Sequence, residues 1–275
     1  MTLINRLPTR TWNRLGVNET ALSWDENGTT EMSPLTVDVT GRKKVVRVEV
    51  NGENEFSRKK VTINAQSETS VTVIEVLSTE NNLAVETELN VKENALVRLI
   101  QVQRSEEKSL VYNKVTSFCD ESGRVELLQV FPGKGDIYSD SLIELTGDKS
   151  SFKSDIGYLG QREQTVDINL VVNHYGKSTE SEINASGALK DSSSKIFRGT
   201  IDFKTGSSDS VGNEKESVLM LGDGVINKTV PLILCAEENV VGNHGATIGE
   251  LDDETLFYFE SRGIGKAEAE NILSL

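Results

Sequence analysis

Residues 231–265 read PLILCAEENVVGNHGATIGELDDETLFYFESRGIG and contain the sharpest change of hydrophobic period in the chain. Up to Ile248 the apolar residues alternate with polar ones, which is typical of a β-strand with one buried face. From Asp252 onward the spacing is helical, and the Asp252 carboxylate can cap the first turn. Gly263 can take the left-handed conformation that ends such a helix. We therefore predict a switch from strand to helix near residue 251.

The same alternation runs through most of the chain before this stretch. Its clearest example is Val166, Ile168, Leu170 and Val172, each separated by one residue. Such strands recur about every 10 to 15 residues and are separated by polar turns. No helical pattern interrupts the region from Val45 to Ile248, so a mostly β protein is predicted.

Two architectures fit this pattern: a sandwich or barrel, and a parallel β-helix whose coils stack on one another. Aromatic residues make up only 5% of the chain, and no proline lies between Pro132 and Pro231. Few aromatics suit a narrow interior, and a stretch without proline keeps the ladder hydrogen bonds intact. These features favour the β-helix only slightly, and the pattern alone leaves both architectures open.

The chain divides by pattern into an N-terminal arm (1–35), a β core (36–250) and a short C-terminal helical segment (251–275). Within the arm, Leu7, Trp12 and Leu15 can line a short helix or pack on the main domain. We predict a docked arm in preference to a binding site. A stack of strands also has open edges, and the arm and the helix from residue 252 are expected to cover its ends in part.

Composition excludes several classes of function. The net charge of −14 argues against binding of nucleic acid or of an anionic membrane. No apolar run reaches the roughly 18 residues of a membrane span, and residues 1–16 lack a signal-peptide core. Cys119 and Cys235 are too few for a disulfide framework, and we expect both to be buried. A cytoplasmic protein is predicted.

Residues with catalytic potential are few. The sequence contains no CxxC, HExxH, Walker A or GxSxG motif. The acids at 252–254 suit a helix start, whereas Glu106–Glu107 and Glu214–Glu216 are interpreted as solvated loops. His174 is interpreted as structural. His244, between Asn and Gly, is by residue type alone more typical of a turn than of a metal ligand.

The segment HGATIGELDDETLFYFESRGI, residues 244–264, resembles the C-terminal signature of the SufB/SufD family of iron–sulfur cluster assembly proteins. Gly245 after the histidine is similar to the SufD type, because SufB-type chains have Glu there. His174, Thr179 and Ser181 fit the family pattern H-x4-T-x-S. Further matches are Phe197-Arg198-Gly199 to Y/F-R-G, Leu219-Met220-Leu221-Gly222 to LLxG, and Leu7-Pro8-Thr9 with Trp12 to the LPT…W opening of SufD chains.

The resemblance implies a right-handed parallel β-helix core with a short N-terminal arm and C-terminal helices. It also implies a non-catalytic scaffold subunit that works with a SufB-type partner, or with a second copy of itself, and with a SufC-type ATPase. No cofactor is expected to stay bound, but a transient iron–sulfur cluster can form at a partner interface. Nucleic acid and membranes are not expected partners.

Within this resemblance His244 is the cluster-assembly residue, since a neutral imidazole can bind iron and can also carry a proton. Cys235 is a weaker candidate, nine residues earlier. In some SufD relatives a cysteine lies two residues before the histidine, where this chain has Gly242. The cysteine that SufB-type chains carry ahead of LLxG is Glu216 here.

The C-terminal segment is the predicted docking site for the ATPase, because its helix presents more apolar surface than a free end should expose. The residues assigned to this contact are Leu256, Phe257, Phe259, Arg262, Gly263 and Ile264. Two other functions remain open: a β-helix enzyme acting on acidic polysaccharide, and a structural interaction module without a ligand.

Overall fold

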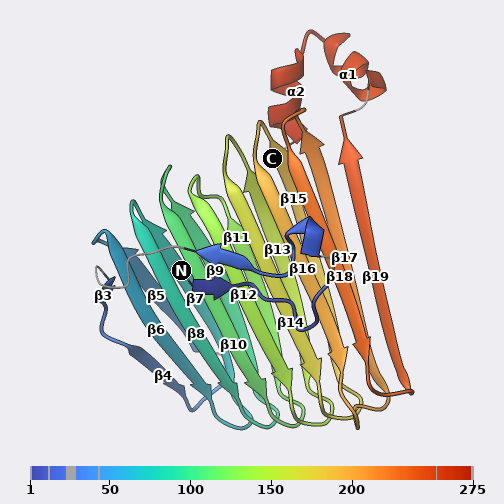
Figure 1. Ribbon diagram of the computed structural model, residues 1–275. Coiled ribbons are helices and arrows are strands. Elements are labelled where there is room, and N and C mark those ends of the chain that lie inside the picture. Colours follow the sequence, from blue (N-terminus) through green and yellow to red (C-terminus); the bar gives the residue numbers. More distant parts are fainter. Residues whose placement is uncertain (1, 12, 23–28, 43, 252, 274–275) are drawn as a thin grey trace.

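The protein is a stack of β coils with two short helices at its C-terminal end (Figure 1). The expected helix cap Asp252 and the arm residue Trp12 lie outside the part of the chain that the structure describes. The computed structural model describes residues 2–11, 13–22, 29–42, 44–251 and 253–273.

Two parallel sheets make up the stack. The first contains, in spatial order, β18 (Ile226–Cys235), β16 (Ser194–Phe203), β14 (Thr165–His174), β12 (Asp136–Leu145), β10 (Leu110–Cys119), β8 (Asn82–Val91), β6 (Phe56–Ala65) and β3 (Thr29–Glu31), with β4 (Leu35–Val39) also paired to β6. The second contains β19 (Val240–Glu250), β17 (Ser210–Leu221), β15 (Glu180–Lys190), β13 (Ser151–Gly160), β11 (Arg124–Phe131), β9 (Leu96–Ser105), β7 (Ser70–Thr79) and β5 (Lys44–Gly52).

Consecutive strands alternate between the two sheets, so each coil contributes one strand to each sheet. From β6 onward, each strand pairs in register with the strand one coil earlier; His174, for example, pairs with Leu145 on one side and Phe203 on the other. This is a parallel β-solenoid, and the predicted β-helix is confirmed. No described residue between Val45 and Ile248 is helical, which also agrees with the sequence.

The coils stay in register because their turns stack as well as their strands. At one edge of the solenoid, the turns from 66–69 to 206–209 each contain a residue with positive φ whose N–H donates to a carbonyl in the next turn. Asn94 donates to Glu121, Ser122 to Asp148, and Lys149 to Lys177. The coils become longer along the chain. The hydrogen bond between Asn94 and Glu68 joins adjacent coils at positions 26 residues apart, whereas the bond between Asn239 and Asp209 joins positions 30 residues apart.

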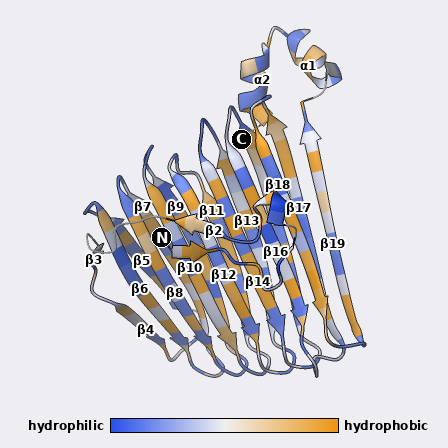
Figure 2. Ribbon diagram, viewed as in Figure 1, coloured by the Kyte–Doolittle hydropathy of each residue, from blue (hydrophilic) through white to orange (hydrophobic). Residues whose placement is uncertain are grey.

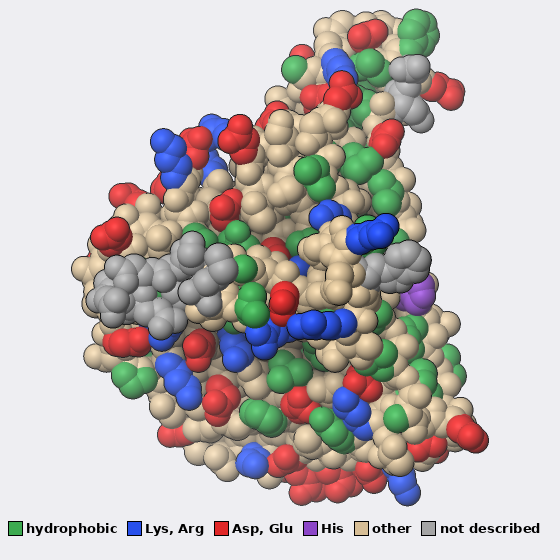
Figure 3. Space-filling model, in the orientation of Figure 1, with side chains coloured by type: hydrophobic (Ala, Val, Ile, Leu, Met, Phe, Trp, Pro, Cys, Tyr) green, Lys and Arg blue, Asp and Glu red, His purple; other side chains and the backbone are tan. Residues whose placement is uncertain are grey.

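Alternation along each strand sends one set of side chains into a narrow apolar interior (Figure 2). Val166, Ile168, Leu170 and Val172 are all fully buried there, as their period predicted. The other set faces outward. Acidic side chains gather along the lower edge in Figure 3, where turns such as 120–123 and 236–239 expose carboxylates.

The N-terminal arm packs on the outer face of the first sheet and does not cover an end of the stack, contrary to the expectation. Its strands β1 (Thr2–Ile4) and β2 (Thr20–Leu22) pair antiparallel, and the 3-10 helix η1 (Asn13–Leu15) lies between them in sequence. Ile4 and Leu22 pack against an apolar patch that strands β6, β8, β10 and β12 present outward. The arm therefore hides outward apolar side chains that would otherwise meet water. The predicted docking is confirmed.

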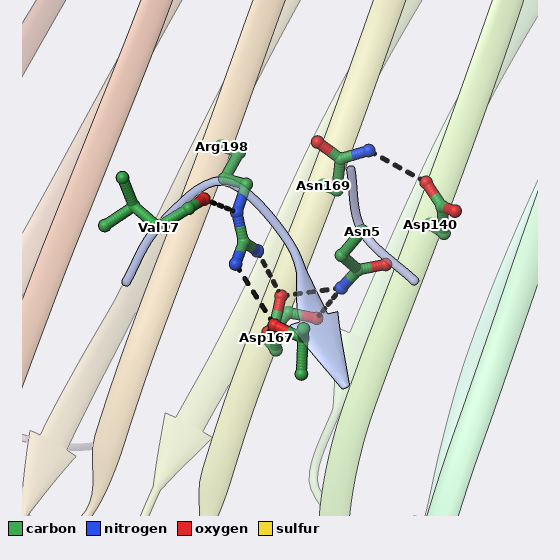
Figure 4. A network of polar contacts seen from close by, with 7 residues as sticks. Asn5, Val17, Asp140, Asp167, Asn169 and Arg198 are labelled. Atoms are coloured by element: carbon green, nitrogen blue, oxygen red, sulfur yellow. Dashed lines mark hydrogen bonds and ion pairs between the residues drawn. The ribbon is translucent and has the colours of Figure 1, made fainter. Parts of the chain in front are cut away.

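A buried polar network fastens the arm to the sheet (Figure 4). Arg198 of β16 pairs with Asp167 of β14 at 2.5 Å, and both side chains are almost completely buried. The Arg198 guanidinium also donates to the carbonyl of Val17 at 2.6 Å and to Thr20 Oγ1 at 3.1 Å. From the arm, Asn5 donates to Asp167 Oδ1 at 2.6 Å, and Thr20 donates to Oδ2. Two charges on the sheet are thus satisfied by each other and by the arm.

The C-terminal segment forms α1 (Asp253–Glu260) and α2 (Lys266–Leu273), both within the predicted helical segment. Gly263, at φ +79°, ends the first helix as predicted. Its N–H donates to the Glu260 carbonyl, and the N–H of Ile264 donates to that of Phe259, which is the Schellman pattern. Arg262 follows the end of α1, and its guanidinium stacks 3.7 Å from the Tyr258 ring centroid.

Loss of the Arg198 guanidinium should destabilise the protein and release the arm. Arg198→Met leaves the Asp167 carboxylate buried with only arm donors, and breaking a buried pair costs about 3 to 5 kcal/mol. We expect the free energy of unfolding in urea to fall by that amount and proteolysis within residues 2–22 to become faster.

The control is Arg98→Met, which breaks a solvent-exposed pair with Glu126 and should cost less than about 1 kcal/mol. Equal losses in the two variants would show that the network under the arm contributes no more than a surface ion pair.

Candidate functional site

The last coil of the solenoid, formed by β18 and β19, is open to solvent. In the described chain, β19 pairs with β17 on one side only and β18 pairs with β16 on one side only. Almost every residue of β19 is exposed, and no residue of β18 is fully buried. Two strand edges with free backbone groups are thus left at this end.

His244 lies on the inner face of this open coil. It pairs with Glu214 of β17, which is buried between the exposed neighbours Asn213 and Lys215. Residues paired in register across parallel strands share a face, so His244 continues the inner column that contains Glu214. Its side chain is nevertheless exposed, because no further coil of the described chain packs over it.

The two glycines beside His244 have different surroundings. A Cβ on Gly242 would come within 2.9 Å of Ile233 Cγ2, because this residue also faces inward, against β18. A Cβ on Gly245 would meet nothing within 4 Å. A group can therefore approach the backbone closely at Gly245 but not at Gly242.

Cys235 is exposed, so the expected burial is wrong for this residue. It ends β18 and pairs with the buried Phe203, which places it on the inner face of the last coil that the structure describes. The contact between Ile233 and Gly242 separates it from His244, and the two candidates are not brought together. Cys119 is buried as predicted, and burial raises the pKa of its thiol to about 12.

The acids at Glu214 and Glu216 lie in strand β17 and point inward, so their interpretation as a solvated loop is wrong. Glu216 is compensated: it forms a buried ion pair with Lys195, accepts from Tyr158 Oη at 3.1 Å, and accepts from Thr229 Oγ1 at 2.6 Å. The partners come from three other strands. If the sequence around these acids had been interpreted as a strand, its period-two alternation would have placed both side chains on the inner face.

Glu214 is not compensated in this way. It is 5% exposed, and its Oε2 atom is buried without a hydrogen-bond partner. Burial, and next the charge of Glu216, raise the pKa of the Glu214 carboxyl to about 8. A Cβ on Gly199 would overlap this carboxyl group, which explains the glycine of the Phe197-Arg198-Gly199 match. Sequence reasoning missed Glu214 because acids are rarely expected inside a coil.

His174 has a structural role, as predicted. It is fully buried at the end of β14; its Nδ1 lies 2.7 Å from Thr179 Oγ1 and its Nε2 2.9 Å from Ser181 Oγ. The H-x4-T-x-S match is thus a hydroxyl clamp around one imidazole, across the turn between two strands. The Phe203 ring lies 4.7 Å away between centroids.

The predicted docking residues lie on and just after α1, at the end of β19. Phe257 is 71% exposed, whereas Leu256, Phe259 and Ile264 are half-buried. The second helix is attached to the solenoid by a hydrogen bond from Lys190 Nζ to Asn271 Oδ1 at 2.8 Å. No helix in the described ranges has the length and apolar character needed to cross a membrane.

His174 should make stability fall in acid. Burial lowers its pKa to about 4, against about 6.5 in an unfolded chain. Between these values the unfolded state binds a proton that the folded state does not, so the free energy of unfolding decreases as pH drops from about 6.5 to 4. We expect this group to contribute a loss on the order of 3 kcal/mol.

The measurement is urea unfolding at pH 7 and pH 4.5 for the wild type and for His174→Gln, which cannot titrate. The variant is expected to be less stable at pH 7, with a gap that narrows in acid. A gap that stays constant between the two pH values would contradict the lowered pKa.

Comparison with known proteins agrees with this architecture. The family model described as "SUF system FeS cluster assembly, SufBD core domain" matches residues 48–275. An iron–sulfur cluster assembly protein SufD of Bacillus subtilis is 34% identical over 50% of this chain and 32% of its own length. A SufBD family protein of Staphylococcus epidermidis is 27% identical over 82% of this chain and 49% of its own length. The chain therefore spans about half or less of these relatives, and it belongs to the SufBD core family of iron–sulfur cluster assembly proteins.

Proposed function

We propose that this chain is a non-catalytic scaffold subunit whose open last coil forms one wall of the place where iron–sulfur clusters are assembled. The observation that carries the proposal is the position of His244, on the inner face of a coil that nothing covers in the described chain. An imidazole exposed at an uncovered end is available to a group that arrives from outside. A histidine fixed inside the stack, such as His174, is not.

The proposed occupant of the open end is a SufB-type subunit, with a second copy of this chain as the alternative. Both β18 and β19 present an unpaired edge and inward-facing apolar side chains such as Ile233 and Ile248. A strand edge of this kind pairs readily with another chain. A partner built from similar coils would continue both sheets and bury the last coil, together with His244.

In this assembly iron and sulfide are the cargo. Neutral imidazole is a suitable ligand for iron, and an imidazole can also carry a proton. The soft thiolate ligands that clusters need would come from the partner, because Cys119 is sealed in the core and Cys235 lies away from His244. Cluster binding is transient in this proposal, with no cofactor held permanently.

Energy from ATP would be supplied by a SufC-type subunit that docks on the C-terminal helices. Phe257 exposes most of its ring, and Tyr258 is 55% exposed beside it. Two large aromatic side chains on one short exposed helix are a typical anchor for a protein partner. Arg262, stacked on the Tyr258 ring, adds a charged group to the same surface.

His244→Ala should leave the complex assembled but lower its content of iron and sulfide. Loss of a metal-site partner costs about 10- to 100-fold in affinity, so we expect iron and sulfide per purified complex to fall several-fold. Yield and ATP turnover should stay near those of the wild type.

The matched control is Asn243→Ala, the adjacent residue on the outer face, which bonds only Asn213. It should keep normal iron. A His244→Ala complex with normal iron per complex but reduced yield would mean that His244 is structural and would end its role in assembly.

Phe257→Asp should abolish capture of the ATPase subunit in a pull-down assay, because a charge is placed at the centre of the apolar contact. The fold should be unaffected, since the ring is 71% exposed. Deletion of residues 251–275 should have the same effect.

Leu15→Asp serves as the control, because Leu15 is 58% exposed on the N-terminal arm, away from the helices. If the ATPase is retained by both Phe257→Asp and the deletion variant, its docking site lies elsewhere on the solenoid.

A further inference from the structure

The carboxyl group of Glu214 lies one coil beneath His244 at the open end. The two residues are direct partners in the ladder between β17 and β19. Adjacent parallel strands are about 4.8 Å apart, so inward side chains at paired positions lie within reach of each other. Both side chains belong to the inner face, and only the last coil separates Glu214 from solvent at this end.

The position of the carboxyl group is set by its surroundings. Gly199, across the interior on β16, makes room for it, since any Cβ there would overlap all three carboxyl atoms. In the last coil, Pro231 is the residue paired with Gly199, and its side chain can neither donate nor accept a hydrogen bond. Of the two residues that the last coil adds over this carboxyl, His244 and Pro231, only His244 carries a polar side chain.

The charged groups around Glu214 are occupied elsewhere. Lys195, the buried cation from β16, is paired with Glu216, which is also bonded to Tyr158 from β13 and Thr229 from β18. Glu214 has no such partner, and its Oε2 atom is buried and unbonded. A buried polar atom without a partner costs about 1 to 3 kcal/mol, and a hydrogen bond from above would remove this cost.

We propose that Glu214 is a positioning residue for His244: its carboxyl group hydrogen-bonds the inner nitrogen of the imidazole, so that the other ring nitrogen faces out of the open coil. The hydrogen bond fixes the rotation of the ring whichever of the two groups carries the shared proton. Residues that act on metals through a histidine commonly hold its second nitrogen in this way. The inference rests on the proposed role of His244 in cluster assembly and adds a residue that prepares it.

The test uses the ring nitrogens of the ¹⁵N-labelled 275-residue chain, observed by long-range ¹H–¹⁵N correlation at one pH near 7.5. The chain has two histidines, and His174, bonded to Thr179 and Ser181, is an internal reference. In the wild type we expect His244 to show one fixed tautomer. Glu214→Leu should shift its signals to those of a freely rotating histidine, while Glu214→Gln, which keeps a hydrogen-bonding group, should shift them less.

Glu182→Gln is the control, because it removes a carboxylate from the exposed outer face of the neighbouring strand β15. The signals of both histidines should then stay in place. If Glu214→Leu does not fold, which the loss of the His174 reference signals would reveal, Gly199→Ala replaces it, since it displaces the carboxyl without removing it. His244 signals that already match a freely rotating histidine in the wild type, or that none of these variants shifts, overturn the proposal.

This result is separable from the test of the proposed function. Normal iron and sulfide in the His244→Ala complex would end the assembly role of His244, even if the ring is held by Glu214. Unchanged ring signals would end the role of Glu214 alone. If both proposals hold, the Glu214→Leu complex should contain less iron and sulfide than the wild type but more than the His244→Ala complex.

Discussion

The structure depends on in-register pairing of each strand with the strand one coil before it. Because paired residues share a face, every inward side chain must fit the side chains directly above and below it. Val166, Val172 and their neighbours satisfy this condition with apolar contacts, and stacked turns prevent the coils from slipping. A polar residue in such a column is stabilised when neighbouring coils supply its partners, as Lys195, Tyr158 and Thr229 do for Glu216.

This constraint explains what the sequence could predict. Period-two alternation is a local property, so the strands were foreseeable, as was the glycine end of α1 at Gly263. The choice of a solenoid over a sandwich or barrel came from the family resemblance. The identity of a residue's neighbour one coil away, about 26 to 30 positions along the chain, is not local. The partners of Glu216 could not be foreseen for that reason, whereas the burial of Glu214 and Glu216 was missed because a loop was predicted there instead of a strand. Cys235 was misjudged because its apolar stretch looks like core, and only the end of the stack leaves it exposed.

The family motifs acquire separate physical meanings once the coils are in place. His174 with Thr179 and Ser181 is a closed clamp inside the stack. In Phe197-Arg198-Gly199, the arginine faces outward to hold the N-terminal arm, and the glycine faces inward to admit the Glu214 carboxyl. Neighbouring residues of one motif thus serve opposite faces of the sheet, which is the consequence of alternation. These residues build the scaffold, and the resemblance alone could not separate them from residues that handle the cargo.

The proposed site lies at the end of the stack, where the inward side chains no longer pack against a further coil of the described chain. Inside the solenoid an inward side chain packs against the coils above and below it, which leaves no room for a ligand. In the last coil the same inward column continues to His244, but no further coil of the described chain packs over it. The uncompensated carboxyl of Glu214 lies directly beneath that gap. In the proposed assembly the partner that covers this end also covers His244 and Glu214, so the proposed site and the proposed subunit interface are one surface.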